Sequence, residues 1–194
     1  DIHTSASLKE IRQDGGELVC VFAENEQELE ARGDAVLIAV GRKPNTAGLF
    51  APGCEPETER GRIAVNERYE TSLPGVWAVG DVIGGIQLAH MASAEAVNAV
   101  AFMCGKEAEI RTDVVPGCVY TSPEIATVGI SAQEAKKQGL NVTTKKYPMT
   151  ANGKTVLSRG ERGYISVTAD AETNVILGAQ LLCERATDMI GEFA

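Results

Sequence analysis

The segment QLAHMASAEAVNAVAFMC, residues 87–104, restricts the fold strongly because it carries one charged side chain, Glu95, before Gly105. Its apolar residues predict a helix that is packed on most of its circumference, and a glycine commonly follows a helix end. The chain has 194 residues, 44% of them hydrophobic, which is enough to bury a core in one or two ordinary domains. We therefore expect a globular protein.

A strand pattern and a glycine-rich loop precede this helix. The apolar run GVWAV, residues 75–79, predicts a buried strand that ends in Gly80-Asp81 and continues as the loop VIGG. In an open α/β sheet, ligands bind beyond the carboxyl ends of strands, where the next helix offers unpaired N–H groups and the positive end of its dipole. Asp81 then accepts hydrogen bonds from ligand hydroxyls, or it only caps a turn beside a core helix. The pattern alone leaves both interpretations open.

The beginning of the chain shows a hairpin pattern and then a strand of another kind. SLKEIRQ and ELVCVFA flank a turn at residues 14–16, which is typical of a β-hairpin. AVLIAV, residues 35–40, is apolar on both faces like a fully buried strand. Residues 46–60 are rich in Gly, Pro and Glu and predict a crossing between domains. GRIAVNERYETS, residues 61–72, then predicts a short half-exposed strand.

The last third of the chain has an antiparallel α+β pattern. A strand near residues 124–129 is followed by a helix, with a capping box from Ser131 to Glu134 and Gly139 at its end. Three more strands are predicted in NVTTKKYPM, GYISVTA and VILGAQLLC, and DAETN joins the last two as a hairpin turn. RATDMIGEFA then starts an amphipathic helix.

Charge and the length of apolar runs exclude some classes of partner. The formal net charge of −9 repels a phosphate backbone, so we expect no nucleic acid. The longest apolar stretches are too short for a bilayer-spanning helix, and the first residues lack the pattern of a signal peptide. We therefore expect no membrane contact, and a cytoplasmic location by default.

The five cysteines predict neither a metal site nor a local redox pair. The two that are closest in sequence, Cys104 and Cys118, are 14 residues apart, and no C-x-x-C spacing occurs. The odd number also argues against a disulfide framework. Reduced, mostly buried thiols are the expected state.

Several of these stretches resemble the pyridine nucleotide-disulfide oxidoreductase family. TSLPGVWAVGDVIGGIQLAHMASAEA is similar to the family's second FAD-contacting segment, and VLIAVGRKPNT resembles the end of its NAD domain. YTSPEIATVGISAQEAKKQG and YPMTANGKTVLSRGERGYISVTADAETNVILGAQLL resemble the start of its dimerisation domain. The resemblance covers nearly the whole chain in the family's own order. ANGK and GYISVTADAETNVILGAQ look most like the dihydrolipoamide dehydrogenases.

The resemblance implies a fold that is α/β plus α+β, in three parts. These are the end of an NAD-binding domain in residues 1–45, the second segment of a Rossmann-like FAD-binding domain in 46–113, and a dimerisation domain, incomplete at its C-terminus, in 114–194. It implies oxidation of protein-bound dihydrolipoamide, with electrons passing through a disulfide and FAD to NAD. It also implies a homodimer, and a lipoyl-bearing partner from a 2-oxo acid dehydrogenase or glycine-cleavage complex.

The resemblance also assigns cofactor-binding residues. Asp81 matches the acceptor for the ribityl hydroxyls of FAD. Gly41 matches a position where the backbone closely approaches NAD, which its missing side chain permits. The segment whose main chain faces the pyrimidine edge of the flavin matches Gln87, Leu88, Ala89 and His90. Since this role belongs to the backbone, we expect the imidazole of His90 to pack at the helix start instead of acting as a base.

The chain also departs from the family. The redox cysteines with C-x-x-x-x-C spacing, the GxGxxG turn for NAD and the C-terminal His-Glu pair have no counterpart in these 194 residues. We therefore expect a fragment of a longer enzyme, with no catalytic residue, no activity by itself and an unpaired strand at residues 36–40. The alternatives are a sister enzyme such as glutathione or mercuric reductase, and a non-catalytic dimerisation or assembly module.

Overall fold

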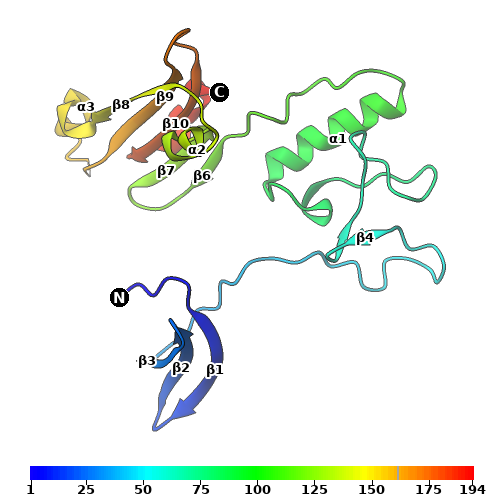
Figure 1. Ribbon diagram of the computed structural model, residues 1–194, viewed down its shortest axis with the longest axis horizontal. Helices are drawn as coiled ribbons and strands as arrows, with labels where there is room; N and C mark the ends of the chain where they lie inside the picture. Colours follow the sequence, from blue (N-terminus) through cyan, green and yellow to red (C-terminus); the bar gives the residue numbers. More distant parts are fainter. Residues whose placement is uncertain (161) are drawn as a thin grey trace. The chain divides into compact units, whose positions relative to one another are not determined.

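The computed structural model describes residues 1–160 and 162–194, which divide into two compact units, Asp1–Arg42 and Lys43–Ala194. The first unit holds one antiparallel sheet (Figure 1). Its strands, in spatial order, are β1 (Ser7–Asp14), β2 (Glu17–Glu24) and β3 (Gln27–Gly33).

The hairpin predicted at the beginning of the chain is confirmed. β1 and β2 pair from Ser7 with Ala23 to Asp14 with Glu17. Alternate β2 side chains, such as Val19, are buried, as a sheet with one covered face requires.

Residues 35–40 form no strand in the part of the chain that the structure describes. Leu37, Ile38 and Val40 are 90%, 64% and 85% exposed. A strand needs a neighbour for its backbone hydrogen bonds, and no described strand pairs with this segment. The buried strand predicted from the pattern is therefore wrong for the described residues of this chain, and the expectation for residues 36–40 stays a prediction.

The second unit begins with little regular structure. Its first elements are β4 (Thr58–Glu59), β5 (Arg62–Ile63), the 3-10 turn η1 (Gly80–Ile83) and α1 (Ala89–Met103). β4 and β5 form a two-stranded ladder, so the half-exposed strand predicted at residues 61–72 is present only as β5. The loop predicted after Asp81 begins within η1.

The buried strand predicted at residues 75–79 is not formed. An isolated bridge joins Glu70 to Trp77, and the N–H of Ala78 donates to Tyr69 O at 3.1 Å. Ala78 is buried while Val76 is 38% exposed. Among the described residues this segment has backbone partners on one side only, and a buried strand needs neighbours on both.

The α1 helix ends where the sequence predicts, and Gly105 after it has a φ of +71°. The helix is covered on one side only. Glu95, Asn98 and Ala99 are buried, whereas Val97, Val100 and Met103 are 41%, 55% and 47% exposed. The prediction of a helix packed on most of its circumference is therefore wrong for the described residues, because nothing in them covers the apolar side.

A five-stranded antiparallel sheet follows, in the spatial order β6-β7-β10-β9-β8 (Figure 1). Its strands are β6 (Gly117–Val119), β7 (Glu124–Gly129), β8 (Val142–Pro148), β9 (Tyr164–Asp170) and β10 (Ile176–Cys183). The strands predicted in this part of the chain are thus confirmed. The turn between β9 and β10 is held by Asp170, whose Oδ1 accepts hydrogen bonds from the N–H groups of Glu172 and Thr173.

Short helical segments accompany this sheet. They are α2 (Ala132–Lys137), η2 (Met149–Ala151), α3 (Gly153–Leu157), α4 (Ala186–Met189) and η3 (Ile190–Phe193). The predicted capping box is confirmed at its first bond, since Ser131 Oγ accepts from the N–H of Glu134 at 3.1 Å. The predicted C-terminal helix begins as α4 and continues as η3.

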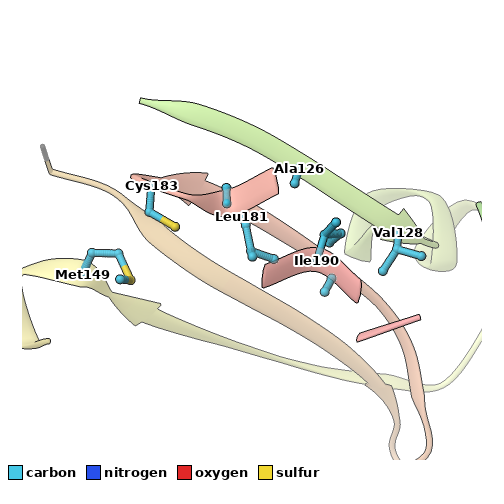
Figure 2. Packing of buried hydrophobic residues seen from close by; sticks show 8 residues of the cluster. Ala126, Val128, Met149, Leu181, Cys183 and Ile190 are labelled. Atoms are coloured by element: carbon cyan, nitrogen blue, oxygen red, sulfur yellow. The ribbon is translucent and has the colours of Figure 1, made fainter. Parts of the chain in front are cut away.

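The main core lies between one face of the five-stranded sheet and the segments η2, α4 and η3 (Figure 2). Leu181 of β10 is 1% exposed and Ile190 of η3 is 3% exposed. The buried members of this cluster are Ala126, Val128, Met149, Ala179, Leu181, Cys183, Ala186 and Ile190. The chain is thus a mixed α and β protein, in which every strand pairing found in residues 1–160 and 162–194 is antiparallel. None of the helices described above is long and apolar enough to cross a bilayer.

Candidate functional site

Asp81 lies in η1, directly after a glycine that no other residue replaces without strain. Gly80 has a φ of +78°, and a Cβ placed on it would lie 3.1 Å from the Cβ of Ala92 in α1. This φ falls in the left-handed region that side chains disfavour. The glycine therefore lets the chain turn tightly against α1, and its backbone determines the position of Asp81. Asp81 itself is half-buried.

A buried carboxylate from α1 holds the same turn. The N–H of Gly80 donates to Glu95 Oε2 at 2.6 Å, and Glu95 is 4% exposed. In the sequence Glu95 stands out only as the single charge in this helix, and no pattern assigned it a role. That isolation was the available signal, because a lone carboxylate in an apolar helix is costly unless it has a partner.

The loop after Asp81 is also tightly arranged. The N–H of Gly84 donates to Asp81 O at 3.2 Å, and Gly84 has a φ of +85°. The side chain of Arg62 lies against this glycine, since a Cβ placed on Gly84 would lie 2.5 Å from Arg62 Cδ. Sequence reasoning gave Arg62 no role either. Only the folded loop brings it beside Gly84.

The predicted main-chain segment forms the start of α1. Leu88 is the N-cap residue, with extended φ and ψ of −128° and 141°, and no side chain caps the helix. The first turn contains no acidic residue, so its N–H groups and the positive end of the dipole are not neutralised there. Gln87 and Leu88 are half-buried, whereas Ala89 and His90 are exposed.

The imidazole of His90 is anchored to the backbone. Its Nε2 lies 2.9 Å from Pro116 O. A carbonyl oxygen only accepts, so Nε2 donates the proton in this bond. The ring is thus tied to the segment after α1 while His90 stays exposed, and its expected packing at the helix start stays a prediction.

Gly41 belongs to the other compact unit, so it is described by itself. Its φ is +100°, and a Cβ placed on it would meet nothing within 4 Å. In the absence of a ligand, glycine is therefore favoured at this position by its backbone conformation and not by crowding. Within the second unit, η1 with Asp81 packs on α1, whereas Gly41 is a residue of the first unit.

The cysteines are less buried than expected. All five are free, and only Cys183 is buried, whereas Cys54 and Cys104 are exposed. Burial raises the pKa of the Cys183 thiol, so this thiol stays protonated and unreactive. Across residues 1–160 and 162–194, no group of His, Cys, Asp and Glu side chains is arranged to hold a metal ion.

A hollow of about 360 Å³ lies among η2, α3 and α4. Met149 and Met189 contribute apolar surface, and Lys154, Glu184 and Arg185 lie at its sides. None of the predicted cofactor-binding residues lines it. We place the candidate site at Asp81 and the start of α1 instead, because α1 offers uncapped backbone donors and the turn that carries Asp81 packs on this helix.

Comparison with known families identifies the family of the chain. Residues 1–96 match the family described as pyridine nucleotide-disulphide oxidoreductase. Residues 115–194 match the dimerisation domain of pyridine nucleotide-disulphide oxidoreductases. The chain therefore belongs to the pyridine nucleotide-disulphide oxidoreductase family. Asp81 and the start of α1 lie within the first of the two matches.

Two of the most similar curated proteins are dihydrolipoyl dehydrogenases. Dihydrolipoyl dehydrogenase 2, mitochondrial, of Arabidopsis thaliana is 39% identical over 180 residues, which are 92% of this chain and 36% of the relative. Dihydrolipoyl dehydrogenase 3 of Pseudomonas putida is 38% identical over 180 residues, covering 93% of this chain and 39% of the relative. The chain thus spans somewhat more than a third of the length of these curated relatives.

A solved structure shows a related fold. The HOCl-induced flavoprotein disulfide reductase RclA from Escherichia coli matches with a TM-score of 0.80 and 28% sequence identity, over 96% of this chain and 42% of that one. The mixed α and β architecture described above is therefore that of a disulfide reductase.

Proposed function

We propose that the complete protein is a dihydrolipoyl dehydrogenase, which oxidises dihydrolipoamide to lipoamide and passes the electrons through FAD to NAD. The substrate dithiol loses two electrons and two protons as its disulfide forms, and NAD⁺ gains a hydride while one proton is released. The observation that carries the proposal is the 39% identity to a dihydrolipoyl dehydrogenase over 92% of the chain. By itself the chain contains no redox disulfide pair, so we expect the 194 residues alone to be inactive.

The residues at the candidate site fit FAD. Glycines occupy the two positions of this loop where a Cβ would meet Ala92 and Arg62, so the loop packs closely on α1 and on the Arg62 side chain. No side chain caps α1, which leaves its first N–H groups available as donors. The ribityl chain of FAD is a flexible polyol and needs a fixed hydrogen-bond acceptor. Asp81 lies between the two glycines of this loop.

We propose the following roles for the predicted residues. The Asp81 carboxylate accepts hydrogen bonds from the ribityl hydroxyls. The dipole of α1 stabilises negative charge at its start by at most about 2 kcal/mol. Gly41 lets the backbone approach NAD. The main-chain segment that faces the pyrimidine edge of the flavin consists of Gln87, Leu88, Ala89 and His90. FAD, when bound, supplies the two-electron chemistry that links the dithiol to NAD.

We also propose the three-part division into residues 1–45, 46–113 and 114–194. The end of the first compact unit at Arg42 and the start of the dimerisation match at residue 115 support it. A homodimer follows from the dimerisation domain. The lipoyl-bearing protein of a 2-oxo acid dehydrogenase or glycine-cleavage complex is the proposed partner, and the cytoplasm is the proposed location.

A sister disulfide reductase is the second candidate function. The fold match to RclA at 28% identity favours it, although the dihydrolipoyl dehydrogenases named above are more similar in sequence. The two functions differ in substrate, since only a dihydrolipoyl dehydrogenase reduces NAD with dihydrolipoamide.

The test uses the complete protein and its Asp81→Ala variant. We expect the unaltered protein to carry FAD and to reduce NAD with dihydrolipoamide, and the variant to lose most of its FAD. Asp34→Ala is the matched control, because Asp34 is an exposed aspartate in the other unit. Full retention of FAD by Asp81→Ala would remove the proposed role of Asp81. Activity with glutathione or mercuric ion alone would assign the protein to a sister enzyme.

A further inference from the structure

We infer that Glu95 is a positioning residue for the flavin site, because it fixes the turn that presents Asp81. The inference rests on the proposed function for its ligand, the ribityl chain of FAD. Glu95 itself touches Gly80 and acts on the site through that residue.

The burial of Glu95 is the first argument. Glu95 is 4% exposed in a helix whose other buried residues are Asn98, Ala99 and Ala101. Removing a carboxylate from water is costly, and an apolar side chain would fill this position at lower cost. The hydrogen bond of 2.6 Å from the N–H of Gly80 offsets part of that cost. We therefore expect Glu95 to have a role besides the packing of α1.

The conformation of the turn is the second argument. Gly80 needs its φ of +78° to pass Ala92, but a glycine populates many other conformations equally well. Rotation about the backbone of Gly80 displaces Asp81, the next residue. The bond from Gly80 to Glu95 selects one of these conformations and ties it to α1. The backbone that leads into Asp81 is thereby held at a fixed position on α1.

The expected consequence is a site that is ordered before FAD arrives. Preorganisation raises affinity because the ordering cost has already been met when the ligand binds. Loss of the Glu95 bond therefore weakens FAD binding as well as the fold. A hydrogen bond to a charged group corresponds to roughly a 10- to 100-fold change in an equilibrium constant.

The test titrates the apo form of the complete protein with FAD and follows the quenching of flavin fluorescence. We expect Glu95→Ala to weaken binding roughly 10- to 100-fold. Glu95→Gln keeps an oxygen acceptor at the same reach and should recover most of the affinity. Glu95→Asp keeps the charge but is one methylene shorter, so it should bind as weakly as Glu95→Ala. The same ranking is expected in the visible circular dichroism of the bound flavin.

Asn98→Ala is the matched control. Asn98 lies one turn further along α1, is 2% exposed and bonds to residues 109–110 instead of the Asp81 turn. This variant should lower the unfolding temperature while FAD affinity changes less than about twofold. Equal loss of FAD affinity in Asn98→Ala and Glu95→Ala, or no loss in Glu95→Ala and Glu95→Asp, would overturn the inference. If the unaltered protein binds no flavin at all, the proposed function fails first and the inference fails with it.

Discussion

Asn98 in α1 holds the backbone of Ile110 at both of its polar groups. Asn98 Nδ2 donates to Ile110 O at 2.7 Å, and Asn98 Oδ1 accepts from the N–H of Ile110 at 2.9 Å. The same Oδ1 also accepts from the N–H of Glu109 at 2.9 Å. A single buried side chain thus replaces the sheet or helix partners that this connecting segment lacks.

Replacing Asn98 with alanine should destabilise the protein by about 1–3 kcal/mol, because the backbone groups of residues 109–110 lose their partner. Urea denaturation measures the change in the free energy of unfolding. Ser93→Ala is the control on the same helix, since Ser93 is exposed and bonds only to Ala89 O. It should stay within about 0.5 kcal/mol of the unaltered protein. A value that small for Asn98→Ala would show that water satisfies the freed groups.

Alanine substitutions at Gly80 and Gly85 distinguish the effect of crowding on stability from the effect of backbone conformation. Both have positive φ, +78° and +71°, but a Cβ on Gly80 would lie 3.1 Å from Ala92, whereas one on Gly85 would meet nothing within 4 Å. Each alanine variant should lose about 1–2 kcal/mol through the left-handed conformation. Gly80→Ala should lose more, because Ala92 must also move. Equal unfolding free energies for the two variants would contradict the close packing of η1 on α1.

Asp170 should make the β9–β10 turn sensitive to acid. Hydrogen bonds from the N–H and hydroxyl of Thr173, and then from the N–H of Glu172, hold the pKa of Asp170 below its ordinary value of 3.8. The unfolded chain therefore takes up a proton at a higher pH than the folded protein. The stabilisation is complete above the ordinary pKa and is lost as pH falls through the lower folded pKa.

Asp170→Ala should accordingly destabilise the protein at neutral pH and converge with the unaltered protein in acid. Urea midpoints measured from pH 7 downward give the comparison. Glu172→Ala is the control, because Glu172 contributes its N–H to this turn and that group remains. A deficit for Asp170→Ala that stays constant down to the acid transition would refute the assignment.

Leu181 tests the core between the sheet and the C-terminal segments. It is 1% exposed, so Leu181→Ala should lower the free energy of unfolding by about 2–5 kcal/mol. Leu157 is 83% exposed, and Leu157→Ala should change it by less than about 0.5 kcal/mol. Thermal or urea unfolding compares the two variants. Similar losses at both positions would mean that the cluster is not the core.

The sequence predicted best where each element finds its backbone partners within the same sheet of this chain. β1 and β2 meet across a short turn, and β7 to β10 complete one another's hydrogen bonds within a single sheet. Residues 35–40 and 75–79 carry the apolar pattern of buried strands, yet they form none in the described residues. An apolar pattern indicates that a segment is suited to burial in a sheet. Whether it forms a strand also depends on neighbouring strands, which the sequence of the segment does not specify.

The candidate site was predictable at Asp81 and at the helix that follows, because the order of strand pattern, Gly-Asp, glycine-rich loop and apolar helix is local. Glu95 and Arg62 were missed because no sequence pattern shows that these side chains meet Gly80 and Gly84, which happens only in the folded loop. The roles of Gln87, Leu88, Ala89, His90 and Gly41 stay predictions.

Anaerobic addition of dihydrolipoamide to the complete protein decides whether the proposed reaction takes place. We predict that the protein as isolated shows flavin absorbance, that dihydrolipoamide bleaches it, and that NAD restores it with one NADH formed for each dihydrolipoamide oxidised. A protein without flavin, or a flavin that dihydrolipoamide leaves unchanged, would contradict the account.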